Sequence, residues 1–234
     1  MATTQQTRTN NANRAFPAPQ APRTARVHGK TTTAPATATS PAVLTNVLTL
    51  VETAQLVQQV LSESFGKTGA RFYVKTQQTD GNTRLFVEWM DGPAEAQVNK
   101  LLLPLQASTQ GQWGGTAPAE HFRLTAQGPQ KIVLAADRII VKRSFSGGLI
   151  GSVLQRLAHR HAARLNPEIR KLLTVENFKR GALLGVLIYG VHWAEAGNSL
   201  HTDVETALHA HTDVQGFPRS ATAASIFARK PLNA

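Results

Sequence analysis

A band of cations in residues 136–180 is the part of the sequence best suited to bind a ligand. Ten lysines and arginines lie in this band, against three acids, Asp137, Glu168 and Glu176. Guanidinium groups match the geometry of phosphate groups, and clustered cations favour a polyanion. The sequence therefore predicts a nucleic-acid-binding surface. Its residues are Arg138, Lys142, Arg143, Arg156, Arg160, Arg164, Arg170 and Lys171, and Lys179 and Arg180 complete the band.

The spacing of three arginines within this band supports the prediction. Arg156, Arg160 and Arg164 are four residues apart, so in a helix they lie along one edge. Like charges in such a row destabilise the helix, and phosphate groups would neutralise them. A solvated polar edge of the helix is the alternative interpretation.

A second anion-binding feature lies where a predicted strand meets a predicted helix. Lys142 and Arg143 end the strand, and Gly147 and Gly148 begin the helix. The backbone amide groups at a helix start are donors to an anion. The glycine pair fits neither the phosphate-loop pattern nor the dinucleotide-binding pattern, so by itself it indicates no nucleotide site.

Histidines and aspartates near the C-terminus have the chemistry of metal ligands. The sequence HTDV occurs twice, and with a further histidine it places five such groups close together in the chain: His201, Asp203, His209, His211 and Asp213. Imidazole and carboxylate groups bind metals, but this spacing matches no motif of known geometry. The serine hydrolase, zinc protease and phosphate-loop patterns are absent. We therefore predict no catalytic residue, metal or cofactor.

The composition agrees with a polyanionic partner. The formal net charge is +11, from 25 lysines and arginines against 14 acids. Such an excess favours nucleic acid or an anionic membrane surface. The chain contains no cysteine, which excludes disulfides, thiolate metal sites and cysteine nucleophiles and suits a reducing cytosol. The N-terminus also lacks the apolar segment of a secretory signal.

Residues 1–42 are predicted to be a disordered basic tail. They contain five cations and no acid, and they have too few large apolar residues to offset the entropy of ordering. Such a tail holds nucleic acid loosely through phosphates. The alternatives are a plain linker, a remnant of a longer protein, and a transit peptide.

The elements that must position these residues begin after the tail. Apolar residues at steps of three and four predict a helix in residues 41–65, with a break near Thr49. Alternation then predicts two strands, residues 71–77 and 84–90, joined by a turn at residues 79–82. A helix follows from Pro93 and stops at Pro104.

The middle of the chain is predicted to contain two more strands and an amphipathic helix. The strands are residues 121–125 and 131–142, and the helix is residues 144–165. Trp113 lies in the polar loop of residues 106–119. It either stacks on a base or folds back over the core.

Residues 166–234 are predicted to be a helical extension. A dense apolar run, GALLGVLIYGVHWA, begins at Gly181 and ends at Ala194. It is short and interrupted by glycine, so we expect a buried or partner-facing helix rather than a membrane span. Residues 204–211 and 220–228 are further candidate helices. The whole indicates an α+β protein with a small, mostly antiparallel sheet of about four strands in residues 43–165.

Two motifs of the predicted sheet resemble a known family. The first is F-x-V-[RK], a polar turn, and a strand ending W-x-D-G-P with Trp89, Asp91, Gly92 and Pro93, followed by the pair Gln97 and Val98. The second is A-D-x-I-x-x-x-R-S in residues 136–144. Together they resemble the type twenty-nine domain of large polyvalent proteins, over about residues 52–165. Departures occur at residues 65–69 and in the loop of residues 106–115.

The resemblance implies a protein of a phage or conjugative element, without an assigned catalytic residue. We therefore expect a non-enzymatic accessory protein that binds nucleic acid through the cation band and the tail. It would act in the cytoplasm of a bacterial host, and a phage particle would carry it there. The alternatives are an interaction or structural module that uses residues 181–194 to bind itself or another protein, and a metal-dependent enzyme that uses the C-terminal histidines and aspartates.

Overall fold

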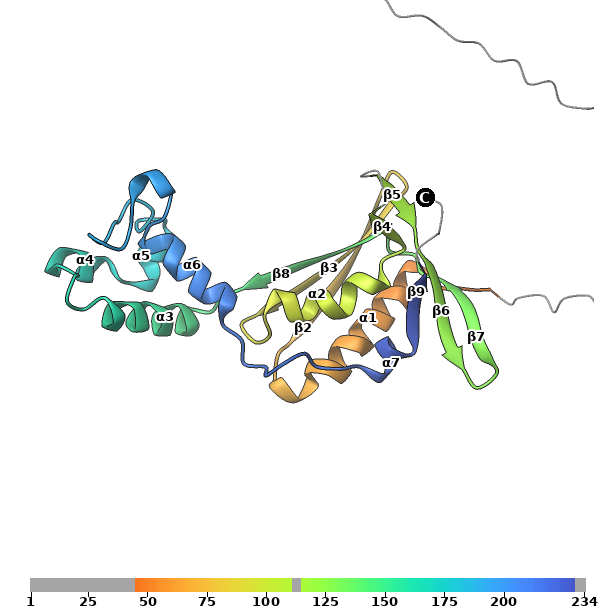
Figure 1. Ribbon diagram of the computed structural model, residues 1–234. Helices are drawn as coiled ribbons and strands as arrows, with labels where there is room; N and C mark the ends of the chain where they lie inside the picture. Colours follow the sequence, from red (N-terminus) through yellow and green to blue (C-terminus); the bar gives the residue numbers. More distant parts are fainter. Residues whose placement is uncertain (1–44, 111–114, 230–234) are drawn as a thin grey trace, which may run out of the picture. The chain divides into compact units, whose positions relative to one another are not determined.

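A computed structural model describes residues 45–110 and 115–229 (Figure 1). The predicted tail at residues 1–42, Trp113 and the chain end after Arg229 lie outside the described residues. The elements follow in the order β1 (Asn46–Val47), α1 (Leu50–Phe65), η1 (Gly66–Thr68), β2 (Phe72–Thr79), β3 (Asn82–Met90), α2 (Glu95–Leu102), η2 (Leu103–Leu105), β4 (Ser108–Gln110), β5 (Thr116–Pro118), β6 (Glu120–Thr125), β7 (Gly128–Val133), β8 (Arg138–Ser144), α3 (Gly147–Arg160), α4 (Pro167–Leu172), α5 (Val175–Lys179), η3 (Ala194–Ala196), α6 (Leu200–Ala210), α7 (Ala221–Ala224) and β9 (Ile226–Arg229).

The fold is α+β, as predicted, but its strands form several small mixed sheets. The described strands form a four-stranded sheet, β1-β7-β6-β9, a three-stranded sheet, β2-β3-β8, and a two-stranded sheet, β4-β5. The pairs β1–β7 and β3–β8 are parallel, and the other four pairs are antiparallel. The expectation of one sheet of about four strands is corrected accordingly.

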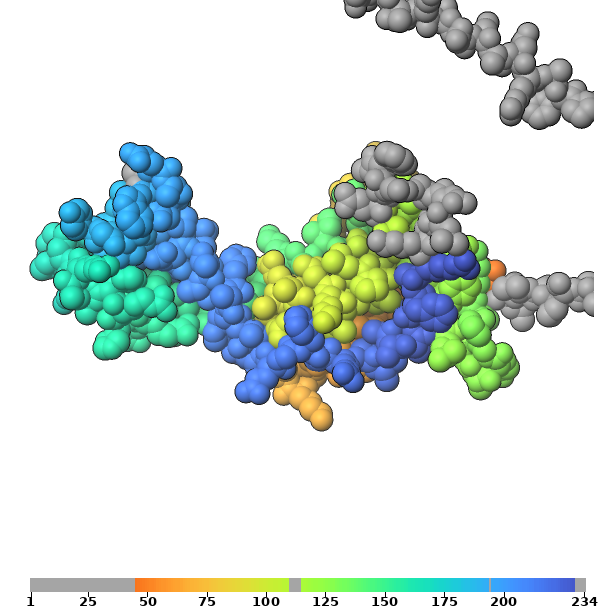
Figure 2. All heavy atoms as spheres, in the orientation of Figure 1, coloured from red at the N-terminus to blue at the C-terminus, as the bar shows by residue number. Residues whose placement is uncertain are grey.

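Two clusters of buried apolar residues support these elements. The first joins α1 and α2 to the inward faces of β2, β3 and β8, with Phe65, Trp89 and Leu102 among its buried side chains. Figure 1 shows α1 and α2 on the same side of this sheet, and Figure 2 shows α2 and the C-terminal segment covering that side. The second cluster joins α3 and α6 to the segment between them, around Leu183 and Ile188.

Local chemistry explains where the first elements begin. The Thr49 side chain accepts a hydrogen bond from the Glu52 amide, and the Glu52 carboxylate accepts one from the Thr49 amide. This reciprocal cap starts α1 at Leu50, directly after the predicted break at Thr49. Before the break, Asn46–Val47 pairs with β7 instead of forming a helix, and residues 41–44 lie outside the described residues. The predicted turn between β2 and β3 is confirmed, since Asp80 and Gly81 both have positive φ, as a two-residue hairpin turn requires.

The predicted strand at residues 131–142 is two strands, β7 and β8, in different sheets. The backbone between them bonds to other elements: the Ala135 amide donates to the Thr53 hydroxyl, and the Ala136 carbonyl accepts from the Ala107 amide. The Asp137 amide donates to the carbonyl of Thr83 at the start of β3. These bonds end β7 and direct the chain into the second sheet.

Two predicted helices are shorter in the structure, and a third is absent. The helix at residues 144–165 is α3, which begins after its cap Ser146 and ends at Arg160. Residues 180–193 form turns rather than a helix, because Gly181 and Gly190 take positive φ and the His192 ring accepts a hydrogen bond from the Ile188 amide. The last candidate helix is only α7, followed by β9. None of the helices in residues 45–110 and 115–229 is long and apolar enough to cross a membrane.

Glu63 attaches the C-terminal segment to α1. Its carboxylate accepts hydrogen bonds from the Ser220 hydroxyl at 2.6 Å and from the amide and hydroxyl of Thr222 at 2.9 and 2.6 Å, and Gln59 donates a further bond. The bond from Ser220, followed by those from Thr222 and Gln59, lowers the pKa of Glu63 to about 2. Charged Glu63 therefore stabilises the folded chain.

We expect Glu63→Gln to lower the free energy of unfolding at neutral pH and to have less effect in acid. The folded pKa is about 2 and the ordinary value is 4.5, so the contribution is complete above 4.5 and is lost as the pH falls towards 2. Urea unfolding of both proteins across this pH range would measure it. Glu176→Gln, at an exposed position of α5, is the control. A stability difference that does not change with pH would contradict the prediction.

Candidate nucleic-acid interface

Arg143 is one of the predicted phosphate-binding residues, but its side chain is buried and bonded within the protein. Only 6% of the residue is exposed. The guanidinium donates to the carbonyls of Asp91 and Gly92 at 3.0 Å each, to that of His211 at 2.9 Å and to that of Leu208 at 3.3 Å. Burial lowers the pKa of Arg143, while the charges of Asp91, Asp213 and Glu95 oppose this shift. We therefore remove Arg143 from the candidate interface.

The turn that receives Arg143 is built from the first sequence motif. The Trp89 ring nitrogen donates to the Pro93 carbonyl at 3.0 Å, and the Asp91 carboxylate accepts from the Ser146 amide at 2.8 Å. Gly92 has φ of +64°, and a Cβ there would lie 3.0 Å from that of Ala70. A side chain at this position would therefore be strained and crowded.

The remaining motif residues also hold the fold together. The buried Gln97 amide donates to the carbonyls of Val214 and Gly216, and its oxygen accepts from the Ala94 amide and the Thr212 hydroxyl. The Asp137 carboxylate accepts from the amide and hydroxyl of Thr83. The motifs thus fix the scaffold, and their polar groups are bonded within the described residues.

Arg138 and Lys142 lie on an exposed sheet face. The strand β8 alternates, so Arg138, Ile140 and Lys142 point away from the cluster that contains Ile139 and Val141. The register places Arg138 beside Arg84 and Lys142 beside Glu88. Arg84 was not among the predicted binding residues, although the alternation of the hairpin places it on this face.

Arg156 and Arg160 lie next to each other on α3 and line one hollow. The hollow has a volume of about 360 Å³, and its other walls are Val153 and Leu157 of α3 and the end of α6, with His211 and Thr212. Both arginines are exposed. Among residues 45–110 and 115–229, no carboxylate lies within salt-bridge distance of either one. Each guanidinium group is therefore able to contact a phosphate group.

The other predicted cations are exposed but differ in their contacts. Arg164 follows the end of α3, so the predicted helix row contains only two arginines, and its guanidinium donates to the Gly190 carbonyl at 3.3 Å. Arg170 donates to the Ala162 carbonyl at 2.6 Å. Lys171 pairs with Glu168 at 3.0 Å, but both side chains are more than 70% exposed, so the pair is weak.

Residues 48–146 match the model of a protein family described as large polyvalent protein associated domain 29. The predicted resemblance is confirmed for this segment. The match associates the chain with phages and mobile elements. Searches of curated proteins and of solved structures gave no match. The matched segment ends at residue 146, directly before α3. It therefore contains Arg138, Lys142 and Arg143 but none of the predicted cations from Arg156 onwards.

The C-terminal histidines and aspartates, which lie after the matched domain, do not converge. His201 stacks on Phe178 and lies 3.4 Å from Glu205, and His209 packs edge-on against Phe145. Asp203 bonds to His192 at 3.0 Å, and Asp213 bonds to His211 at 3.0 Å. In the described part of the chain, no group of three such side chains is placed to hold a metal ion. We therefore assign no metal-dependent chemistry to them.

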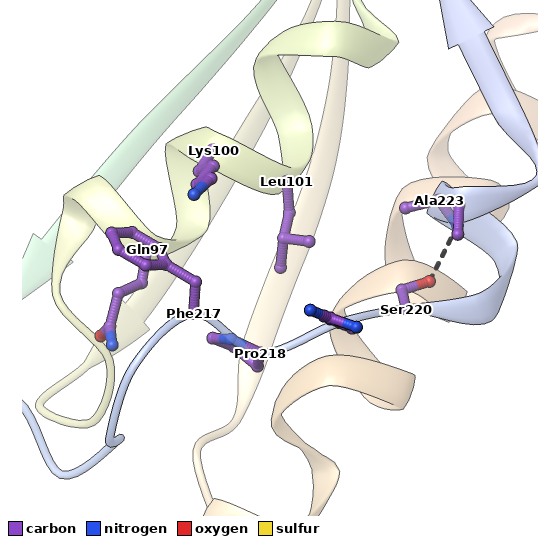
Figure 3. A pocket seen from close by; sticks show the side chains of 9 residues that line it. Gln97, Lys100, Leu101, Phe217, Pro218, Ser220 and Ala223 are labelled. Carbon is purple, nitrogen blue, oxygen red and sulfur yellow. Dashed lines mark hydrogen bonds between the residues drawn. The ribbon is translucent and has the colours of Figure 1, made fainter.

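A further hollow lies between the matched domain and the chain after α6 (Figure 3). Its volume is about 340 Å³, and Figure 3 shows that its side chains come from α2, from the segment before α7 and from α7. The Lys100 ammonium lies 3.9 Å from the centre of the Phe217 ring. The lining residues include Arg219 and Ser220 but no carboxylate and no histidine.

We predict that Arg143→Met lowers the free energy of unfolding by about 3 kcal/mol or more. The change keeps much of the side-chain volume but leaves four carbonyl groups without a charged donor. Urea unfolding followed by circular dichroism would measure this loss. Lys142→Met, at the exposed neighbouring position, is the matched control and should change stability by less than about 0.5 kcal/mol. Equal effects of the two substitutions would contradict the role of Arg143.

Proposed function

We propose that this chain is a phage or mobile-element protein that binds nucleic acid through the exposed cations of residues 147–180. The observation that carries the proposal is the pair Arg156 and Arg160, which are exposed and line one hollow. Residues 147–180 contain seven lysines and arginines against two acids, Glu168 and Glu176. This excess gives the surface the charge that a phosphate backbone requires.

The contacts of the surrounding cations support the same partner. Arg164 and Arg170 use part of their donor capacity on carbonyl groups, and each guanidinium has five N–H donors. Both stay exposed and charged, so they are able to contact further phosphates. The cations come from a helix, a turn and a second helix. Such a surface contacts the phosphate backbone of a nucleic acid rather than the edges of its bases. We therefore infer binding without strong sequence preference.

The motif residues support a non-enzymatic role. Trp89, Asp91, Gln97 and Asp137 form hydrogen bonds that hold the scaffold, and we assign no reaction to them. We infer that the chain acts in the cytoplasm of a bacterial host, as an accessory of the element that encodes it. Entry with the phage particle is the route that we propose.

We predict that Arg156→Gln with Arg160→Gln weakens nucleic-acid binding and its salt dependence together. Each lost phosphate contact removes about 0.9 from the slope of log K against log salt for a duplex. Two lost contacts therefore reduce the slope by about 1.8. Fluorescence anisotropy with a labelled duplex of about 16 base pairs, between about 50 and 200 mM salt, would measure it.

A second double variant, which also loses two cations, tests whether binding depends on residues 147–180 or only on the net charge of the chain. Lys67→Gln with Arg219→Gln removes two exposed cations from other elements. It should leave the slope nearly unchanged if residues 147–180 form the interface. The proposed function is wrong if the wild-type chain binds no nucleic acid at about 50 mM salt, or if both double variants weaken binding equally.

Four exposed apolar side chains favour a protein-interaction surface as a second candidate function. Leu184, Leu187, Tyr189 and Trp193 are 61%, 39%, 95% and 61% exposed, and all lie in residues 181–194. Aromatic residues in an exposed apolar patch are typical of interfaces. These side chains lie in a segment that turns at Gly181 and Gly190 instead of forming the predicted helix.

Self-association is the form of this second candidate that is simplest to test. We expect Tyr189→Ser with Trp193→Ser to shift a self-associating chain towards the monomer, because these exposed side chains lose apolar area in a contact. Sedimentation velocity at several protein concentrations would detect the shift. Val51→Ser with Leu124→Ser, at two other positions that are each 61% exposed, is the control. A wild-type chain that is monomeric at every concentration would contradict self-association.

A further inference from the structure

The outer face of the three-stranded sheet combines exposed aromatic rings with cations. Along β2, β3 and β8, the outward side chains form cross-strand rows in the observed register. The rows are Tyr73, Glu88 and Lys142; Lys75, Phe86 and Ile140; and Gln77, Arg84 and Arg138. The opposite side chains of the same strands lie in the first buried cluster with α1 and α2. The outward residues are all exposed or half-buried.

The charge of this face is strongly unbalanced. The outward positions of the three strands carry four cations, Lys75, Arg84, Arg138 and Lys142. Their single acid is Glu88, which pairs with Lys75 at 2.6 Å. Hydrogen bonding to Lys75 and its charge lower the pKa of Glu88, and the charge of Lys142 adds to this shift. The face therefore carries a net charge of +3, from four cations and one acid, and suits a polyanion.

The aromatic rings make this face different from the surface of residues 147–180. Tyr73 is 61% exposed, and Phe86 is half-buried in the next row of the adjacent strand. Such diagonal neighbours lie about 7–8 Å apart. A hollow of about 270 Å³ opens beside Tyr73, and its walls include Met90, Lys142 and Ser144. A base is able to enter a hollow of this kind and stack on the neighbouring ring.

We propose that this outer sheet face binds single-stranded nucleic acid, with bases stacked on Tyr73 and Phe86 and phosphates held by the four cations. The inference rests on the proposed function and deepens it, since it names unpaired bases as the ligand. A duplex hides the faces of its bases within the stack, whereas a single strand presents them to aromatic side chains. Two of the predicted binding residues, Arg138 and Lys142, acquire a specific role on this face.

The test compares two ligands and two variants of the full chain. The ligands are a labelled single strand of about ten thymidines and a labelled duplex of about 16 base pairs. Tyr73→Thr with Phe86→Thr removes both rings but keeps residues that favour strands. We expect this variant to bind the single strand about thirtyfold more weakly or worse, since each of the two stacked bases contributes about five- to a hundredfold. Duplex binding should change less than twofold. Phe227→Thr, on β9 of the other sheet, is the aromatic control and should bind both ligands like the wild type.

A second variant keeps the test valid if loss of Phe86 unfolds the chain. Arg84→Gln with Lys142→Gln leaves the rings in place and removes two exposed cations. It should lower the salt slope for the single strand by about 1.4, since each phosphate contact contributes about 0.7. Photo-crosslinking of a bromodeoxyuridine-containing single strand should in addition label the peptide that contains Tyr73.

The outcomes separate this inference from the proposed function. If both sheet-face variants bind the single strand like the wild type while Arg156→Gln with Arg160→Gln weakens duplex binding, the inference is wrong and the proposed function stands. If the wild type binds neither ligand, both are wrong. If the face variants lose a co-purifying protein but keep single-strand binding, the face is a protein-binding surface and the inference is likewise wrong.

Discussion

The burial of one guanidinium determines how the parts of this chain are joined. Arg143 lies at the end of β8, and its donors reach the Asp91–Gly92 turn of the first cluster and the end of α6 in the second. A buried charge is costly unless strong acceptors replace water, and here four backbone carbonyls do so. The surrounding geometry follows from this requirement. Asp91 and Gly92 take positive φ, so that both carbonyls point at Arg143, and Asp91 also caps the chain entering α3.

The matched motifs are best understood as parts of this arrangement. Trp89 closes the turn onto Pro93, Ser144 donates to the Trp89 carbonyl, and Gln97 holds the segment that follows α6. The residues that identify the family therefore encode a scaffold. Function must come from side chains that the scaffold leaves exposed, which is why the family match alone does not assign one.

Some of the fold was predictable because its causes are local. The hairpin of β2 and β3 depends on alternation and on the Asp80–Gly81 turn, and both are visible in the sequence. The α+β class followed from the same patterns. The helix predicted in residues 181–194 is wrong. Its apolar residues favour a buried helix, but Gly181 and Gly190 adopt positive φ, a conformation that ends a helix. The division of residues 131–142 depends on Thr53 and Ala107, which are distant in the sequence.

The candidate site was predictable in composition but not in arrangement. The cation band was visible as an excess of charge, yet the sequence could not show that Arg143 is buried, because two of its acceptors lie at residues 208 and 211. Spacing by four suggested a row of three arginines, but α3 ends at Arg160 and leaves Arg164 outside it. By contrast, the alternation of β2 already predicted that Tyr73 and Lys75 lie on the opposite face of the strand from Phe72 and Val74. The register with β3 and β8 was needed to show which rings and cations lie beside them.

The distribution of the cations suggests why charge alone is a poor guide to function here. Arg143 is buried and bonds to backbone carbonyls, and Lys171 forms an ion pair with Glu168. Arg156 and Arg160 are exposed, and no carboxylate among the described residues pairs with them. On the sheet, Lys75 holds Glu88, so the net charge there comes mainly from Arg84, Arg138 and Lys142. Cations attract any polyanion and lose affinity with salt, whereas an aromatic ring adds affinity only for a nucleic acid that exposes the faces of its bases. In the proposed single-strand site, the rings of the sheet face would therefore supply the discrimination that the cations cannot provide.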